Sequence, residues 1–506
     1  MATDKYKPTV LYDYLNVNTG FESNPIGCEV YRSENGGQSW KKVNEKEVSI
    51  FFSYGYYFAK IFVSPYNENK IYTIGLDVML STDGGKSWKN IAKNNVHSDH
   101  HALWVDPKKD SHLINGNDGG VNITYDDGEV WYKANTPAVG QFYAITTDNA
   151  KPYNVYGGLQ DNGVWVVPSQ TGRNPFGGSG LGLTVATETN IGGGDGMQVQ
   201  VDSRDNVTTY YGSQFGAYSR SNRATREGTK RITPRHEMGE FPYRFNWQSP
   251  ILLSSHNPDI VYFGSNHFHR SMNQADTMIT MTGDLSTGGK AGNVPYGTLT
   301  TISESPTRFG LIYTGTDDGN IHITKDGGYS WEQLNQTVQA ASSNSKVKSK
   351  KSKTQLVNLR LHTNNLWVSR VLASQHKEAR VYATLNGYRF DNFAPYVYVS
   401  EDYGSSWKQI GKDLPAGQAG LPNEPVNVIR EDPKNDSILY VGTDGGLYVS
   451  FDAGNSFMMW NAGLPKSVPI HDIAIQQRDN EIILGTHGRS LYVSKLDEVQ
   501  KRAMKK

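Results

Sequence analysis

The chain has 506 residues, which is more than one ordinary globular domain unless the architecture is repetitive or barrel-like. Lys and Arg together number 50, as do Asp and Glu, so no net charge favours nucleic acid or an acidic lipid surface as a partner. Cys28 is the only cysteine, which excludes an intramolecular disulfide and a cysteine-based zinc site. The sequence contains no run of about 18 apolar residues and no pattern of a signal peptide at its start.

A short motif, Ser/Thr-x-Asp-x-Gly-x-x-Trp, recurs along the chain and is the pattern known as an Asp-box. Its copies are SENGGQSW (33–40), STDGGKSW (81–88), TYDDGEVW (124–131), TKDGGYSW (324–331), SEDYGSSW (400–407) and SFDAGNSF (450–457). Successive copies of the terminal aromatic residue are 48, 43, 200, 76 and 50 positions apart. The long gap fits four units, which predicts three degenerate units inside it, and the sequence contains them at 141–167, 196–219 and 249–271. A last unit follows at 468–494.

Each full unit follows one order: an apolar run, a turn, a strand such as ILYVGTDGG, a strand such as LYVS, the Asp-box turn and a last strand. Four antiparallel strands repeated at this period are typical of propeller blades. We therefore expect an all-β fold, a β-propeller of four-stranded antiparallel blades with Asp-box turns and about nine to ten blade units. The units form either one large ring or a seven-bladed ring plus extra blades.

The repeat also divides the chain. Residues 1–92 hold the first blade units, which are also what a remnant of a preceding propeller would leave, and residues 93–498 hold the main propeller array. Within that array, residues 339–356 are rich in Ser and Lys, and we expect a basic mobile loop there. No aromatic residues interleave these lysines, so nucleic acid is not expected to bind them. Residues 499–506 read as a tail.

The Asp-box residues have a structural interpretation. The Ser/Thr hydroxyl and the Asp carboxylate can bond to backbone N–H groups of their own turn, and the aromatic ring can pack on a neighbouring sheet. Sugar stacking on these rings is the less favoured alternative. The residues assigned this structural role are Asp83, Trp88, Asp126, Trp131, Asp326, Trp331, Asp402, Trp407 and Asp452.

The order of antiparallel strands predicts which face of the propeller carries function. The start of the first strand and the turn between the second and third strands share one face, and the Asp-box turns lie on the other. Because the innermost strands line the channel, we expect residues at these positions to surround its mouth. The candidate ligand-binding residues on this face are Asp118, Gln160, Trp165, Arg370, His471, His487 and Arg489. Aspartates are also good turn residues, so a plain turn role is the alternative.

A histidine cluster, HSDHH, lies just before one of these first strands. It contains His97, Asp99, His100 and His101, which we count among the candidate ligand-binding residues. In an extended strand, His97, Asp99 and His101 point one way and His100 the other. His and Asp ligands suit transition metals or Ca²⁺ and Mg²⁺, so those three residues are the candidate metal ligands. A hydrogen-bonded loop cluster is the favoured alternative, and no cofactor is required.

Several stretches outside the Asp-boxes resemble a known family. HSDHHALWVDPKKDSHLINGNDGG, QFYAITTDNAKPYNVYGGLQDNG, GGGDGMQVQVD and GTHGRS are similar to bacterial BNR-repeat, sortilin-type propeller proteins, which are usually classed as glycosyl hydrolases. The resemblance runs from residue 8 to residue 496 and implies export to the periplasm or the cell exterior. The chain opens on the strand-like TVLYDYLNV with no first strand before it, so it resembles the C-terminal portion of such a protein, with an N-terminal propeller half missing.

Two functions are consistent with the resemblance. The first is hydrolysis or binding of carbohydrate at the channel mouth, where cleavage requires one protonated and one ionised carboxyl group about 5–10 Å apart. The candidate catalytic residues are Asp161, Asp195, Asp317 and Asp318. The second is a sortilin-like propeller without catalysis, which binds a peptide, a protein or a glycan. Three residues, Trp165, Trp247 and Trp367, lie outside the Asp-boxes; core packing is favoured for each, and Trp165 is also a candidate carbohydrate platform.

Overall fold

The computed structural model describes residues 2–3, 11–16, 28–48, 60–93, 95–134, 139–170, 189–288, 296–335, 366–411 and 420–503. The chain divides into two compact units, unit 1 (Met1–Val139) and unit 2 (Gly140–Lys506). The division expected from the sequence, after residue 92, lies one sheet earlier. Every sheet carries the same repeat, so the repeat does not mark where the packing between sheets changes. The basic segment 339–356 lies outside the described residues.

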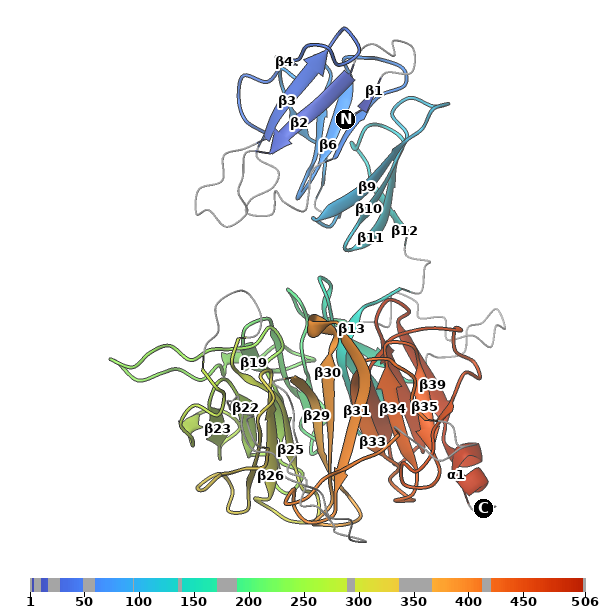
Figure 1. Ribbon diagram of the computed structural model, residues 1–506. Helices are drawn as coiled ribbons and strands as arrows, with labels where there is room; N and C mark the ends of the chain where they lie inside the picture. The colour runs from blue at the N-terminus through green and yellow to red at the C-terminus, as the bar shows by residue number, and fades with distance from the viewer. Residues whose placement is uncertain are drawn as a thin grey trace, which may run out of the picture. The chain divides into compact units, whose positions relative to one another are not determined.

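The described residues form ten antiparallel sheets, nine of four strands and one of three, so the predicted all-β class is confirmed and the arrangement is propeller-like. Unit 1 holds three sheets (Figure 1). Their strands are β1 (Ala2–Thr3), β2 (Leu11–Asn16), β3 (Cys28–Ser33) and β4 (Lys41–Lys42); β5 (Lys60–Val63), β6 (Ile71–Ile74), β7 (Val78–Ser81) and β8 (Lys89–Asn90); and β9 (His100–Val105), β10 (Leu113–Asn117), β11 (Gly120–Thr124) and β12 (Tyr132–Ala134).

The first sheet differs from the expectation that no strand precedes TVLYDYLNV. Strand β1 pairs antiparallel with β2, so this sheet also has four strands. A strand of only two residues is too short to show the alternation of apolar and polar residues by which strands are recognised in a sequence.

Unit 2 holds seven consecutive sheets. Their strands are β13 (Phe142–Thr147), β14 (Asn154–Leu159), β15 (Gly163–Pro168) and β16 (Thr189–Gly192); β17 (Gln200–Val201), β18 (Thr208–Ser213), β19 (Ala217–Asn222) and β20 (Lys230–Arg231); β21 (Ile251–Leu253), β22 (Val261–Gly264), β23 (Phe268–Ser271) and β24 (Ile279–Thr280); β25 (Leu299–Glu304), β26 (Ile312–Thr316), β27 (Ile321–Thr324) and β28 (Glu332–Gln333); β29 (Trp367–Ala373), β30 (Val381–Gly387), β31 (Asn392–Ser400) and β32 (Lys408–Gln409); β33 (Val426–Glu431), β34 (Leu439–Thr443), β35 (Leu447–Ser450) and β36 (Met458–Met459); and β37 (Ile470–Gln476), β38 (Glu481–Thr486) and β39 (Leu491–Lys495). A 3-10 turn, η1 (Tyr388–Phe390), joins β30 to β31, and α1 (Asp497–Ala503) follows β39.

The sheets of unit 2 pack on one another in a circular order. The first strands β21, β25, β29, β33 and β37 each contact the sheet before them, and β18 of the second sheet contacts β15 and β16 of the first. The circle closes where β13 of the first sheet contacts β37 and β38 of the last. The contact between first and last sheets is polar as well as apolar: the N–H of Ile145 donates to Oδ2 of Asp472 at 3.0 Å, and the hydroxyl of Tyr153 donates to Oε2 of Glu481 at 2.6 Å. No sheet of unit 2 therefore lacks a neighbour on either face.

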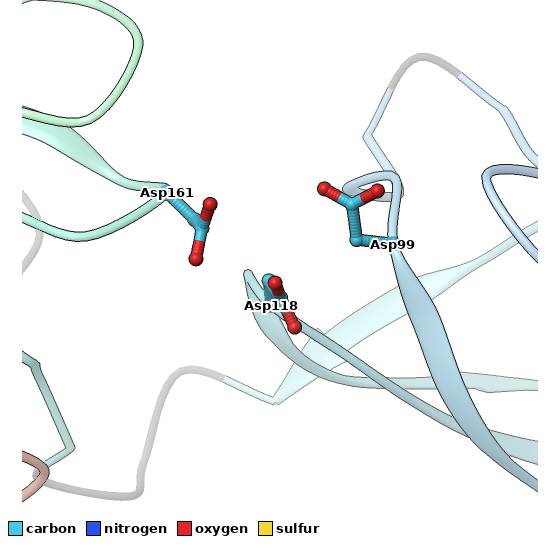
Figure 2. A group of neighbouring side chains, drawn as sticks. All are labelled: Asp99, Asp118 and Asp161. Carbon is cyan, nitrogen blue, oxygen red and sulfur yellow. The ribbon is translucent and has the colours of Figure 1, made fainter. Parts of the chain in front are cut away.

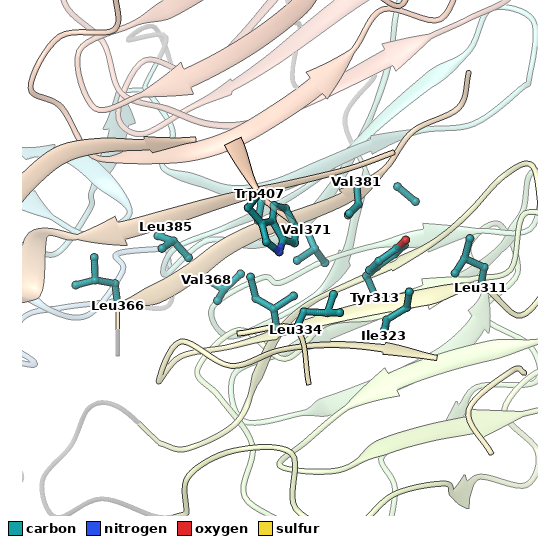
Figure 3. Packing of buried hydrophobic residues seen from close by; sticks show 13 residues of the cluster. Leu311, Tyr313, Ile323, Leu334, Leu366, Val368, Val371, Val381, Leu385 and Trp407 are labelled. Carbon is teal, nitrogen blue, oxygen red and sulfur yellow. The ribbon is translucent and has the colours of Figure 1, made fainter. Parts of the chain in front are cut away.

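Burial follows from this packing. All residues of the second strands β26 and β34 are buried, as are those of the third strands β27 and β35, because a sheet lies on each side of them. The fourth strands β28 and β36 are exposed at the outer edge. Runs such as IYTGT and LYVGT accordingly carry no charged residue and are buried throughout, with no alternation of buried and exposed positions. Figure 3 shows one of the resulting cores, between the sheets of β25–β28 and β29–β32, with Leu385, Val371 and Trp407 among its members.

The Ser/Thr-x-Asp-x-Gly-x-x-Trp segments form closed hydrogen-bonded turns, which we call the aspartate turns, at the ends of the third strands. At residues 324–331, the hydroxyl of Thr324 donates to Oδ1 of Asp326 at 2.7 Å and accepts the N–H of Gly328 at 2.9 Å. The same Oδ1 accepts the N–H of Ser330 at 2.9 Å, and the indole of Trp331 donates to the carbonyl of Gly328 at 3.0 Å. The turns around Asp83, Asp402 and Asp452 carry the corresponding carboxylate bonds.

Across the described residues, no helix has the length and apolar character needed to cross a membrane.

Candidate functional site

One end of unit 2 collects the starts of the first strands and the turns between second and third strands. In the first sheet, Phe142 at the start of β13 pairs with Leu159 at the end of β14, and the N–H of Gln160 in the following turn donates to the carbonyl of Gln141 at 2.9 Å. Corresponding bonds join Asp444 to Pro425 and His487 to Pro469. We call this end the mouth of unit 2; the aspartate turns, which follow the third strands, lie at the other end.

Two candidate catalytic residues meet at the mouth. Asp161 occupies the β14–β15 turn with a φ of 60°, and Asp195 lies before β17 with only 4% of its surface exposed. Oδ1 of Asp195 accepts the N–H of Asp161 at 2.8 Å. Burial raises the pKa of Asp195, the backbone bond from Asp161 opposes the rise, and the charge of the Asp161 carboxylate adds to it. Two carboxyl groups this close hold one proton between them more readily than two negative charges.

Aromatic side chains adjoin this carboxyl pair. The indole of Trp247 donates to the hydroxyl of Tyr143 at 3.2 Å, and burial together with the charge of Asp195 raises the pKa of Tyr143. The ring of Phe215, which is 45% exposed, meets Trp247 edge-on with centroids 5.1 Å apart. The same ring contacts Tyr296 at 5.7 Å. Four rings, from β13, the β18–β19 turn and the loops before β21 and β25, therefore form a continuous aromatic cluster.

The 3-10 turn η1 contributes a cation to the same end. The guanidinium of Arg389 lies 4.1 Å from the ring centroid of Trp367 and 4.5 Å from that of Tyr388. Burial raises the pKa of Tyr296, and the positive charge of Arg389 opposes that rise. Tyr388 is 44% exposed. We call Tyr143, Phe215, Trp247, Tyr296, Tyr388 and Arg389 the mouth ring.

The other two candidate catalytic residues serve the structure of their loop. The carboxylate of Asp317 accepts backbone N–H groups from Tyr296, Gly297 and Thr298 at 2.6 to 3.1 Å. The carboxylate of Asp318 accepts the N–H of Thr287 at 2.7 Å and the hydroxyls of Thr287 and Thr316. Both residues are nearly fully buried. With these bonds in place, neither carboxylate is directed at a ligand.

The remaining candidates of unit 2 are dispersed. The indole of Trp165 donates to the carbonyl of Asn162 at 2.6 Å and its ring packs on a core cluster. The rings of His471 and His487 are tilted by 32° with centroids 4.4 Å apart, and burial lowers the pKa of His471 to about 4. Arg489 is exposed. Arg370 lies below the mouth in a cavity among the first strands.

In unit 1, the HSDHH segment divides at the start of β9. His100 is buried, and its Nδ1 lies 2.8 Å from Oδ1 of Asn115. Nε2 of His101 lies 2.7 Å from the Asp118 carboxylate on the β10–β11 turn. Asp99 has a φ of 63°, so the extended geometry expected for this segment does not include it. Figure 2 shows Asp99 just ahead of β9 and Asp118 at its turn.

A divalent-metal site in unit 1 stays a prediction. Carboxylate oxygens of Asp99 and Asp118 lie within 4.8 Å of one another, and Asp118 already pairs with His101. Nδ1 of His97 faces the carbonyl of Ser98 at 2.9 Å. Two carboxylates with a nearby imidazole suit a hard cation better than zinc, whereas His97 contributes a loop hydrogen bond.

The raised pKa of Asp195 predicts how stability changes with pH. A carboxyl group whose pKa is higher in the folded state stabilises the fold at low pH, and this stabilisation is lost as the pH rises above the unfolded pKa of about 3.9. Asp195→Asn stays neutral at every pH. Its free energy of unfolding, relative to that of the parent protein, is therefore expected to be higher at pH 7 than at pH 4 in urea titrations.

Asp205→Asn is the control for that titration because its stability relative to the parent is expected to change with pH in the opposite direction. Burial would raise the pKa of Asp205, but hydrogen bonds from the side chain and backbone of Thr208 outweigh it and lower the pKa. The carboxylate of Asp205 therefore stabilises the fold above its unfolded pKa, and its loss shows more at pH 7 than at pH 4. If the free energies of unfolding of the two variants, relative to the parent, changed with pH in the same direction, the raised pKa of Asp195 would be contradicted.

Sequence reasoning missed most of the mouth ring. It named the adjoining carboxyl pair, Asp161 and Asp195, and favoured core packing for Trp247. It proposed no function for the other members of the ring, Tyr143, Phe215, Tyr296, Tyr388 and Arg389. Aromatic residues are common in strands, so no local pattern separates them from core. The one signal that could have found them is their position near the strand starts and turns that the repeat aligns at this end.

No family model matches the sequence, and no curated protein matches it. Solved structures similar to the chain include the crystal structure of the GH74 enzyme from Niastella koreensis. The two chains are 14% identical, the match covers 97% of this chain and 76% of that chain, and the TM-score is 0.29. A likeness this distant carries no statement about activity.

Proposed function

We propose that unit 2 is a seven-bladed propeller that binds carbohydrate at its mouth. The observation that carries the proposal is the mouth ring, with its two exposed aromatic side chains and its stacked guanidinium. The carboxyl pair of Asp161 and Asp195 adjoins it, at the end where the first strands begin. The circular order of its seven sheets supports the propeller assignment.

The chemistry of the ring suits a sugar. Sugars present apolar C–H faces and polar hydroxyl edges, and aromatic rings with nearby polar groups are the usual partners for ligands of mixed polarity. Phe215 and Tyr388 are exposed enough to stack on such a ligand. Asp161 and the hydroxyl of Tyr143 can accept and donate hydrogen bonds beside them.

Binding fits the geometry better than hydrolysis by two carboxyl groups. Cleavage of a glycosidic bond needs the two groups about 5–10 Å apart, with the sugar between them. Asp161 and Asp195 instead share a hydrogen bond, and the carboxylates of Asp317 and Asp318 are held by loop bonds. We therefore assign the mouth a binding role. Export of the protein, which such a role would suit, stays a prediction.

The test is titration of the full chain with soluble β-glucan, xyloglucan and chito-oligosaccharides in a calorimeter. Trp247→Ala removes the central ring, and the loss of one well-packed aromatic contact of about 2 kcal/mol lowers affinity at least about tenfold. The control is Tyr329→Ala, which removes a 75% exposed ring on an aspartate turn at the other end. We expect it to leave affinity unchanged.

Two results would contradict the proposal. One is the absence of binding by every glycan tested, and the other is binding that Trp247→Ala and Tyr329→Ala weaken equally. Product analysis of the same mixtures tests for catalysis. Release of shorter oligosaccharides that Asp161→Asn and Asp195→Asn both abolish would support hydrolysis instead of binding alone. Binding of peptides in place of glycans would favour the sortilin-like alternative.

A further inference from the structure

Below the mouth, the first strands of all seven sheets of unit 2 surround a cavity of about 230 Å³. Three charged side chains meet at its wall: Arg370 from β29, Arg430 from β33 and Asp472 from β37. Nη2 of Arg370 and Nη2 of Arg430 both lie 2.9 Å from the same atom, Oδ1 of Asp472. Two guanidinium groups therefore share one carboxylate oxygen.

The single negative charge of Asp472 balances only one of the two guanidinium groups that it contacts. Its Oδ1 also accepts the N–H of Ile473 at 3.0 Å, and its Oδ2 accepts the N–H of Ile145 at 3.0 Å. The cluster keeps one uncompensated positive charge, because Arg is always protonated in proteins. Burial lowers the pKa of Arg430 to about 10, and the charge of Arg370 adds to this effect.

Another carboxyl group among the lining residues, Glu304, does not supply the missing charge. Its Oε1 accepts the hydroxyl of Tyr262 at 2.9 Å, and its Oε2 accepts the N–H of Ser255 at 3.2 Å. These bonds lie in the layer between two sheets. At the same time Nε of Arg370 is buried without a hydrogen-bond partner among the described residues. A buried guanidinium N–H left unpaired keeps its full cost of desolvation.

From the shared carboxylate, the uncompensated charge and the unpaired Nε–H, we propose that this cavity binds a small oxyanion between Arg370 and Arg430. Guanidinium groups bind oxyanions through paired N–H donors, and such charge-assisted bonds are the strong ones. A phosphate or sulfate group, or the carboxylate of a small acid, would accept the N–H of Arg370 and balance the charge. The site is separate from the mouth ring and does not depend on carbohydrate binding.

The proposal is tested by equilibrium dialysis of the full chain with labelled phosphate, sulfate and glucuronate at constant ionic strength. We expect at least one of the three to bind, and Arg370→Gln to weaken its binding on the order of tenfold or more. The control is Arg308→Gln, which removes a 40% exposed guanidinium paired with Glu378. It leaves the affinity unchanged.

A second variant separates an anion site from a purely structural cluster. Asp472→Asn removes the competing negative charge while its amide oxygen can still accept a backbone N–H. An anion site then binds its ligand more tightly, and added ligand raises the unfolding midpoint of this variant more than that of the parent. Failure of all three anions to bind the parent would overturn the proposal. Equal binding by the parent and Arg370→Gln would also overturn it.

Discussion

Replacing Glu431 by Ala is expected to lower the free energy of unfolding of the protein by about 3–5 kcal/mol, the range for removing one partner of a buried charged group. Glu431 ends β33 with 4% of its surface exposed. Its carboxylate accepts the one hydroxyl hydrogen of Ser374, whose Oγ lies 3.0 Å from Oε1 and 2.8 Å from Oε2, and the hydroxyl of Tyr382 at 3.1 Å. It also lies 3.3 Å from Nη1 of Arg380.

The large effect follows from what the substitution leaves behind. The Tyr382 hydroxyl and the guanidinium of Arg380, which is 5% exposed at its side chain, would lose an acceptor in a place that water does not reach. Buried donors without a partner each cost about 1–3 kcal/mol. Urea denaturation, monitored by tryptophan fluorescence, measures the difference in the free energy of unfolding between the parent and Glu431→Ala.

Glu401→Ala is the matched control, because its carboxylate pairs with the same arginine at 2.8 Å but is 57% exposed at its side chain. Exposed ion pairs contribute about 0–1 kcal/mol. A Glu431→Ala variant no less stable than Glu401→Ala would contradict the role assigned to the buried carboxylate. Similar buried tyrosine–carboxylate bonds join Tyr440 to Asp432 and Tyr262 to Glu304, so the result applies to other sheets as well.

The second large effect is expected at Leu385, which is fully buried in the core between the sheets of β25–β28 and β29–β32 (Figure 3). Leu385→Ala leaves a cavity in a packed interior and is expected to lower the free energy of unfolding by about 2–5 kcal/mol. Leu385 lies on β30 three positions before Tyr388, the first residue of η1, which also carries Arg389. A loosened β30 also weakens glycan binding at the mouth.

Denaturation and glycan titration of the same preparations check this prediction. Ile279→Ala is the control, because Ile279 is 53% exposed on the outer strand β24, and surface substitutions usually stay within about 0.5 kcal/mol. A loss of stability at Leu385 without weaker binding would show that η1 is positioned independently of the core. A loss below about 1 kcal/mol would contradict the packing itself.

Much of the fold could be read from the repeat. The Ser/Thr-x-Asp-x-Gly pattern depends on bonds within a few residues, such as those from Thr324 to Asp326 and Gly328, so it can be recognised locally. The degenerate units at 141–167, 196–219 and 249–271 became visible from spacing alone. The strand of two residues at Ala2–Thr3 and the division after Val139 carry no comparable signal.

The candidate site could be predicted only in part. Asp161 and Asp195 stood out because their stretches depart from the repeat, and the structure brings them within hydrogen-bond distance. Asp317 and Asp318 looked equally suitable in sequence. Their carboxylates accept N–H groups of Tyr296 and Thr287, which lie 21 and 31 positions away, and the sequence contains no pattern that marks these bonds.

By itself, the sequence determined the all-β class, the repeated sheets and the hydrogen-bonded turns, because each depends on contacts between residues close along the chain. Only the tertiary structure decided which side chains meet. Arg370, Arg430 and Asp472 come from three successive sheets, and Asp472 bonds to Ile145, 327 positions earlier in the chain. The mouth ring and the cavity beneath it exist because circular packing brings the first strands together, and no local pattern encodes that closure.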